Sequence, residues 1–169
     1  MAARRGGVAG SEDLVENLTF RATAADRSAT YLAQAVEVHV DLDTGAVTPR
    51  RVVSVHEVGR VVNRMLFRTQ IYGGPMQGLG YALMENLQVD ESGRVLNTNL
   101  HEYKIPTIAD TPEFEIILLP PDLSLGLTPI GEGPNAGIAP ALTNAVCDAI
   151  GPRPLDIPLT PARIRAFAR

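Results

Sequence analysis

The sequence predicts an α+β fold in which β-hairpins and a small mixed sheet pack against helices. Apolar and polar residues alternate over residues 36–43 with the period of a half-buried strand. Residues 138–150 form an apolar segment of helical length that ends before a glycine. The chain has 169 residues, 45% of them hydrophobic and 20% charged, which suits one globular domain with a real core.

Each element can be assigned in order along the chain. We expect residues 1–30 to be a weakly ordered lead-in and residues 31–169 to be the folded domain. The strand over residues 36–43 continues through an Asp-Thr-Gly turn into a second strand that ends near His56, which makes a hairpin. The other predicted elements are a helix over 65–87, a hairpin over 87–96, an extended loop over 97–113, a strand over 114–119, a Pro/Gly loop over 120–137, the helix over 138–150 and a short helix that starts at Thr160-Pro161.

Composition excludes several classes of protein. The net charge of −4 argues against a general nucleic-acid or acidic-membrane binder, which would carry a basic stripe. The longest apolar run, residues 116–121, is far shorter than the ~20 residues of a membrane span. A single cysteine, Cys147, forms no internal disulfide and cannot hold an iron–sulfur cluster, so we expect a cytoplasmic location, with Cys147 as a small core residue.

No signal peptide or metal site is expected from the sequence. The two arginines near the start are followed by no apolar segment of the kind that signal peptides have. The three histidines fall on different predicted elements and no pair has the spacing of metal ligands; they are His39, which we expect to face solvent, His56 and His101.

Residues 70–80 are the first candidate for a binding function. Gln70 and Gln77 are seven residues apart, so a continuous helix places both amides on one face. Each glycine inside a helix costs about 1 kcal/mol relative to alanine, so four of them need another explanation. Either a large polar ligand approaches the bare backbone, or a second helix crosses there tightly. The four glycines are Gly73, Gly74, Gly78 and Gly80.

Residues 128–140 are the second candidate. Glu132 lies between Gly131 and Gly133 on a loop that leads directly into the apolar helix. A glutamate in such a turn is by default solvated. A carboxylate held in a pocket at this position would instead be suited to act as a general base.

Several motifs in series resemble a known family. They are HEVGR at 56–60, NRMLFRTQIYGGPMQGLGYALMEN at 63–86, LNTNLHEYKIPTIADTPEFEIILL at 96–119, PIGEGPNAGIAPALTNAVCDAIG at 129–151 and LDIPLTPARI at 155–164. In order and spacing they are similar to the C-terminal end of the large subunit of the molybdenum hydroxylases. This is the xanthine dehydrogenase/aldehyde oxidase family, which includes carbon-monoxide dehydrogenase and isoquinoline oxidoreductase.

The resemblance implies a molybdenum–molybdopterin cofactor and a hydroxylation reaction on an aldehyde or an N-heterocycle. It identifies Glu132 as the residue that matches the family's active-site base beside the molybdenum. Gln70 matches a glutamine that approaches the cofactor, and Gln77 and Gly78 complete the same motif. Gly131, next to the base, is grouped with these cofactor-binding residues. A metal ion acidifies water that it binds, so a carboxylate nearby is a suitable proton acceptor.

The sequence also departs from the family pattern. Residues 127–129 are Leu-Thr-Pro where the family usually has a lysine, and Gly133 replaces a proline after the glutamate. Glu57 replaces the usual aspartate and Arg64 the usual proline. These changes keep Glu132 in place but leave the substrate open.

The family's large subunit is several times longer than this chain, which implies partners. We expect the remaining part of the molybdenum subunit, an iron–sulfur subunit and possibly a flavin subunit, besides a small-molecule substrate. Neither an iron–sulfur cluster nor FAD is expected on this chain. One alternative is a non-catalytic assembly module or a decayed fragment, and another is a stand-alone small-molecule binder.

Overall fold

A computed structural model of the chain describes residues 19, 29–122, 124 and 126–167. The predicted lead-in over residues 1–30 lies almost wholly outside the described residues. Within them, the predicted α+β class is confirmed: three strands form one mixed sheet and helices pack on it. The strands are β1 (Tyr31–Val40), β2 (Val47–Glu57) and β3 (Glu113–Leu118).

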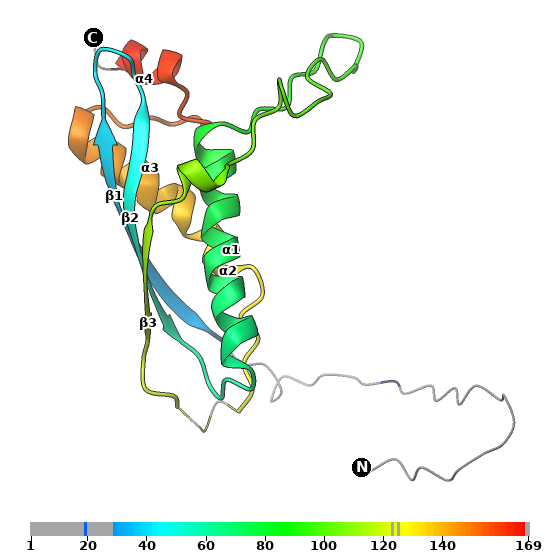
Figure 1. Cartoon of the computed structure of the whole chain (residues 1–169), viewed down its shortest axis with the longest axis vertical. Helices are drawn as coiled ribbons and strands as arrows, with labels where there is room; N and C mark the ends of the chain where they lie inside the picture. The colour runs from blue at the N-terminus through cyan, green and yellow to red at the C-terminus, as the bar shows by residue number, and fades with distance from the viewer. Residues whose placement is uncertain (1–18, 20–28, 123, 125, 168–169) are drawn as a thin grey trace, which may run out of the picture.

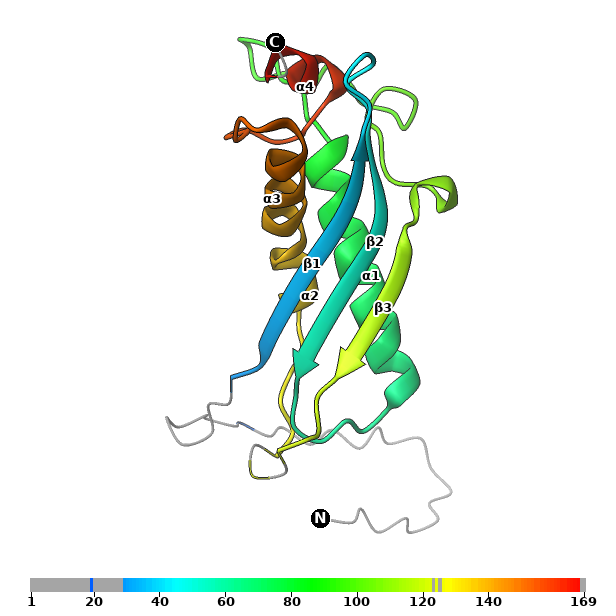
Figure 2. The same cartoon turned by 90° about the vertical axis from the view of Figure 1, so that its left-hand side faces the viewer.

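The sheet has the order β1-β2-β3 (Figure 2). β1 and β2 form the predicted antiparallel hairpin, in which Gln34 lies directly opposite Ser54. The turn is stabilised by the Asp41 carboxylate, which accepts hydrogen bonds from the backbone of Asp43 and Thr44. β3 runs parallel to β2, so the chain must cross over between them, and α1 (Arg64–Leu83) lies in that connection.

The helices α1, α2 and α3 lie over one face of the sheet, whereas α4 lies at its end, beside the β1–β2 turn (Figure 2). α3 packs on β1, and α1 packs on both α2 and α3. The odd-numbered residues of β1 are exposed, whereas its even-numbered residues are half-buried beneath the helices. The helices are α1 (Arg64–Leu83), α2 (Gly133–Ala136), α3 (Ile138–Ile150) and α4 (Pro161–Phe167), with a 3₁₀ turn, η2 (Ile108–Asp110), before β3.

Among the described residues, an apolar cluster joins the sheet, α1 and the C-terminal helices. Burial of these side chains, at about 25 cal/mol per Å² of apolar surface, is the main stabilising term of the fold. The buried members are Val52, Leu79, Ala82, Ile138, Ala139, Leu142, Val146, Leu159 and Ile164. Cys147 is only half-buried and is not part of this cluster, so its prediction as a core residue was wrong.

The long central helix is shorter than predicted. α1 begins where the Asn63 side chain caps the backbone N–H of Leu66. It ends at Leu83 and not at residue 87, because the next two backbone N–H groups both turn back to the Gly80 carbonyl. The helix passes through Pro75 without a break.

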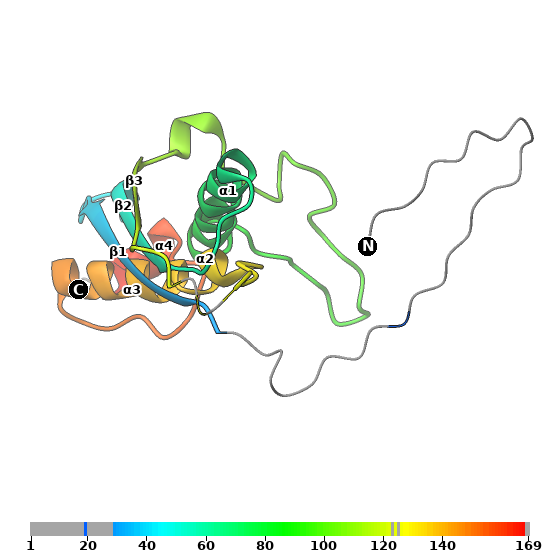
Figure 3. The ribbon, with the colours of Figure 1, turned by 90° about the horizontal axis from the view of Figure 1, so that it is seen from below.

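After α1 the chain projects away from the body (Figures 1 and 3). We call residues 85–106 the arm. The predicted hairpin over 87–96 is reduced there to one bridge, between Val89 and Val95. Two predicted loops also contain short helices, η2 in 97–113 and α2 in 120–137.

Candidate functional site

Glu132 lies at the start of α2, in a segment that we define as residues 131–135, the Glu132 segment. Gly131 has φ +50, a left-handed conformation that favours glycine. The Glu132 carbonyl accepts the backbone N–H groups of Asn135, at 3.0 Å, and Ala136, at 3.3 Å. The Glu132 side chain is exposed, and no residue that the structure describes hydrogen-bonds its carboxylate. The pocket considered for this carboxylate is therefore not formed by the described residues alone.

Two glutamine amides hold the backbone on either side of Glu132. Gln70, on α1, donates from Nε2 to the Gly131 carbonyl at 2.7 Å. Gln34, on β1, donates from Nε2 to the Pro134 carbonyl at 2.9 Å. The Glu132 backbone is thus held between two different elements of the fold, while its carboxylate remains free.

The glycines of α1 allow this close approach. A Cβ atom on Gly74 would come within 2.9 Å of the Pro134 Cβ, and one on Gly78 would overlap Ile138. The tight helix crossing considered above therefore accounts for Gly74 and Gly78. Gly78 is buried in that crossing, although the motif placed it among the cofactor-binding residues.

Gly73 is different, because a Cβ there would meet nothing within 4 Å. Gln70, Gly73 and Gln77 are spaced to share one face of α1, and all three are exposed. Gln77 accepts a hydrogen bond from the Asn135 Nδ2 at 3.2 Å, and Asn135 Oδ1 is buried with no partner among the described residues. Amide groups beside a bare backbone fit the polar edge of a large ligand such as a pterin.

An open hollow of 550 Å³ lies next to this face. Gln70 and Gly131 line it, so two of the predicted site residues share one cavity. Its other walls are mostly apolar side chains from residues 58–67 and 127–130. Glu132 follows Gly131 directly but does not line the hollow.

A buried polar seam, missed in the sequence analysis, lies beneath the Glu132 segment. Ser54 Oγ lies 3.1 Å from Gln34 Nε2 and 2.7 Å from His56 Nε2. Ser54 is 0% and His56 is 1% exposed, and burial lowers the pKa of His56 below its ordinary 6.5. The sequence did contain a signal: Gln34, Ser54 and His56 are polar residues in the buried phase of their strands.

Two features are absent from the described part of the chain, a cluster of metal ligands and a membrane-spanning helix. No group of three or more His, Cys, Asp or Glu side chains there could hold a metal ion. None of its helices is both long and apolar enough to cross a bilayer.

Comparison with protein families gives one match over most of the chain. Residues 6–112 match the model of the molybdopterin cofactor-binding domain. The putative xanthine dehydrogenase molybdenum-binding subunit XdhA of Escherichia coli (strain K12) is 38% identical over 133 residues, which is 76% of this chain and 18% of that protein. The aldehyde oxidoreductase molybdenum-binding subunit PaoC of the same organism is 36% identical over 139 residues, 79% of this chain and 19% of that protein.

Solved structures show the same similarity. Quinoline 2-oxidoreductase from Pseudomonas putida 86 superposes with a TM-score of 0.72 at 29% identity, over 78% of this chain and 17% of that one. Aldehyde oxidoreductase from Desulfovibrio gigas gives a TM-score of 0.73 at 28% identity, over 82% of this chain and 15% of that one. The chain therefore spans less than a fifth of the length of these relatives.

Proposed function

The chain belongs to the molybdopterin cofactor-binding domain family of the molybdenum hydroxylases, and we propose that it forms the C-terminal part of a molybdenum subunit. In this proposal the assembled enzyme hydroxylates an aldehyde or an N-heterocycle. When bound, the molybdenum cofactor supplies the redox centre of that reaction. The residues of this chain bind one edge of the cofactor and supply a base.

The observation that carries the proposal is the contrast within the Glu132 segment. Gln34 and Gln70 hold the carbonyls of Pro134 and Gly131, so the backbone is fixed, yet the Glu132 carboxylate is used by no described residue. A glutamate that stabilised the fold would use its carboxylate on a neighbour, and one that was merely solvated would not need a fixed backbone on both sides. A general base needs a defined position and a free carboxylate oxygen that accepts a proton.

Three further residues support cofactor binding. Gln70 donates from Nε2 to the Gly131 carbonyl, which leaves its Oε1 to accept a hydrogen bond from a ligand. Gln77 accepts from Asn135 through Oε1, which leaves its Nε2 to donate to a ligand. Gly131, in a left-handed conformation that few residues adopt, turns the chain directly before the base. We assign Gly78 an indirect role, since its missing Cβ lets Ile138 and the Glu132 segment approach α1.

Exposed apolar side chains around the hollow support a covering partner. Three apolar side chains that line the hollow are largely exposed: Val62 (79%), Leu66 (62%) and Leu127 (64%). Apolar clusters of this kind mark interaction surfaces. We assign this surface to the rest of the molybdenum subunit, which would also exclude water from Glu132. Iron–sulfur and flavin subunits of a cytoplasmic complex complete the proposed assembly.

The role of Glu132 is tested in the enzyme assembled from this chain and the rest of its subunit. Glu132→Gln keeps the shape of the side chain but removes the base. We expect unchanged molybdenum content and a fall in kcat of about 10²- to 10⁴-fold, the usual contribution of a general base. Glu91→Gln, at an exposed carboxylate on the arm, is the matched control and should leave kcat unchanged.

Two outcomes would refute the proposal. One is a Glu132→Gln enzyme that keeps most of its kcat. The other is equal turnover by the remaining subunits with and without this chain, which would favour the non-catalytic assembly module. Molybdenum analysis of the complex that co-purifies with the chain from its native source gives a complementary readout.

A further inference from the structure

We infer that Gln34 is a positioning residue for Glu132, and that its amide is itself oriented by the buried Ser54–His56 pair. The inference extends the proposed function, because it concerns the residue that we assign as the base. It also assigns a role to the buried polar seam, whose residues are not among those that we propose to contact the cofactor.

The Pro134 carbonyl decides which way the Gln34 amide points. A carbonyl only accepts hydrogen bonds, so the atom 2.9 Å from it must be the Nε2 donor and not Oε1. The second hydrogen on Nε2 then points to Ser54 Oγ, 3.1 Å away. Both N–H groups of the Gln34 amide therefore donate hydrogen bonds, one to β2 and one to the Glu132 segment.

His56 completes the same directional chain. Ser54 Oγ accepts from Gln34, and its own proton has no other acceptor among the described residues, so we assign that proton to the bond with His56 Nε2, at 2.7 Å. This arrangement needs His56 to be neutral with its proton on Nδ1. Because Ser54 and His56 are shielded from solvent, water does not compete for these bonds, and the chain of donors keeps one direction.

Gly137 closes the space behind the amide. Gln34 Oε1 is buried with no partner among the described residues, and a Cβ atom on Gly137 would overlap it. The same Cβ would lie 3.2 Å from Leu32 Cδ1. The amide therefore fits only while residue 137 has no side chain, which provides a second, independent way to displace it.

Gln34 acts on Glu132 through the backbone. Pro134 lies two residues after Glu132, and Gly131, held by Gln70, lies one residue before it. Without Gln34 the segment keeps the bond from Tyr81 Oη to the Asn135 carbonyl, at 3.1 Å. We therefore expect its loss to loosen the segment without unfolding the domain.

Hydrogen exchange in the full-length chain tests this directly. Gln34→Met keeps an unbranched side chain of similar length but has no donor. The amides of Asn135 and Ala136, which bond the Glu132 carbonyl, should exchange roughly tenfold faster, the effect of losing about one hydrogen bond. Gln88→Met, at an exposed arm glutamine, is the matched control and should leave both amides unchanged. Unchanged exchange in a folded Gln34→Met chain would overturn the inference.

A double-mutant cycle separates positioning from general destabilisation. Gly137→Ala should speed the same two amides when Gln34 is present, because the new methyl displaces its Oε1. In a Gln34→Ala background there is no amide to displace, so Gly137→Ala should add only the small effect of its contact with Leu32. Fully additive effects of the two substitutions would contradict a shared mechanism.

The assembled enzyme provides the functional readout. Gln34→Met should lower kcat about tenfold while KM and molybdenum content stay unchanged, because it misplaces the base and leaves the binding groups intact. A fall in molybdenum content with an unchanged kcat per molybdenum would overturn the positioning role. The hydrogen-exchange test and the Glu132→Gln test can fail separately. An active Glu132→Gln enzyme would refute the role of Glu132 as the base. The exchange rates would still show whether Gln34 holds the Glu132 segment.

Discussion

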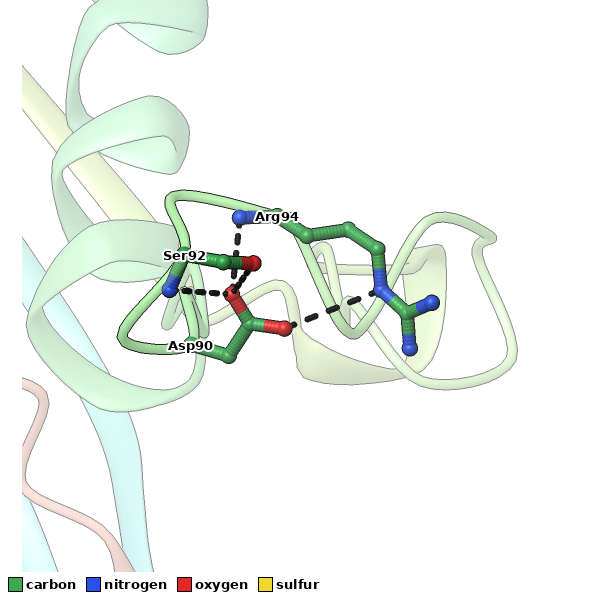
Figure 4. Close-up of polar contacts among 3 residues, drawn as sticks. All are labelled: Asp90, Ser92 and Arg94. Carbon is green, nitrogen blue, oxygen red and sulfur yellow. Dashed lines mark hydrogen bonds and ion pairs between the residues drawn. The ribbon is translucent and has the colours of Figure 1, made fainter.

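The Glu132 segment and the arm are both exposed connections, but they are held in opposite ways. The side-chain hydrogen bonds of the Glu132 segment join it to residues 54 to 100 positions away, on β1 and α1. The arm is held by bonds within itself, such as those of Asp90 with Ser92 and Arg94 at its tip (Figure 4). The longest-range of the side-chain bonds at its base, from Tyr103 Oη to Glu85, spans 18 positions.

The difference shows what each kind of bonding can fix. Local bonds give the arm a shape of its own but do not set its position relative to the core. Long-range bonds fix the backbone of Glu132 relative to α1 and β1, although its side chain is exposed, like those of Ser92 and Arg94 in the arm. Position relative to the core is what a catalytic group requires.

The largest expected effect comes from a substitution at Gly78, where α1 packs against the Glu132 segment. Gly78→Ala places a methyl group against Ile138 and the Asn135 carbonyl, which should lower the free energy of unfolding by about 1–3 kcal/mol. Gly73→Ala, on the open face of the same helix, should instead raise it by about 0.5–1 kcal/mol. Urea denaturation of both variants measures this contrast, and effects of the same sign would contradict the assignment of the crossing.

A smaller and purely local effect is expected in the arm. Asn97 is 7% exposed, donates to the Asn86 carbonyl at 2.7 Å and accepts the Gln88 N–H at 2.9 Å. Asn97→Ala should cost the arm about 1–2 kcal/mol of local stability and speed its proteolysis. Exchange in the Glu132 segment should not change. A change there would mean that the two regions are coupled.

The smallest effect is a pH dependence that arises from His56, which is buried beneath the Glu132 segment. Burial lowers the pKa of His56, so below pH 6.5 the unfolded chain binds a proton that the folded chain does not. Stability should therefore fall as the pH drops below about 6.5, and the Glu132 segment should loosen before the arm does. His56→Gln should abolish this fall below about pH 6.5, whereas His39→Gln, on the exposed face, should keep it. An unchanged acid profile in His56→Gln would refute the buried neutral histidine.

Local sequence patterns were enough for only some of the regular elements. Alternation gave the β1–β2 hairpin, and the apolar segment before Gly151 gave the bounds of α3. The end of α1 was missed because it depends on a backbone turn at Gly80, where Glu85 and Pro106 pack at the base of the arm. The packing of Pro106 against Gly80 joins residues far apart in the sequence, so no local pattern predicts it.

The candidate site could be predicted only in part, for the same reason. The motifs marked Gln70 and Glu132, and the structure brings Gln70 to the residue before Glu132. Gln34 lies about a hundred positions from Pro134, so their contact follows only from the packing of β1 against the start of α2. A glutamine in the buried phase of a strand was visible in the sequence, but its partner was not.

The central claim is that Glu132 is held in place to face a cofactor that other protein helps to bind. A structure of the assembled, molybdenum-loaded subunit tests it most directly. The account predicts that the Glu132 carboxylate is covered, lies within hydrogen-bond reach, about 3 Å, of the group whose proton it takes, and keeps the bonds of Gln34 and Gln70 beside it. A Glu132 carboxylate that remained in bulk solvent, remote from the cofactor, would contradict the account.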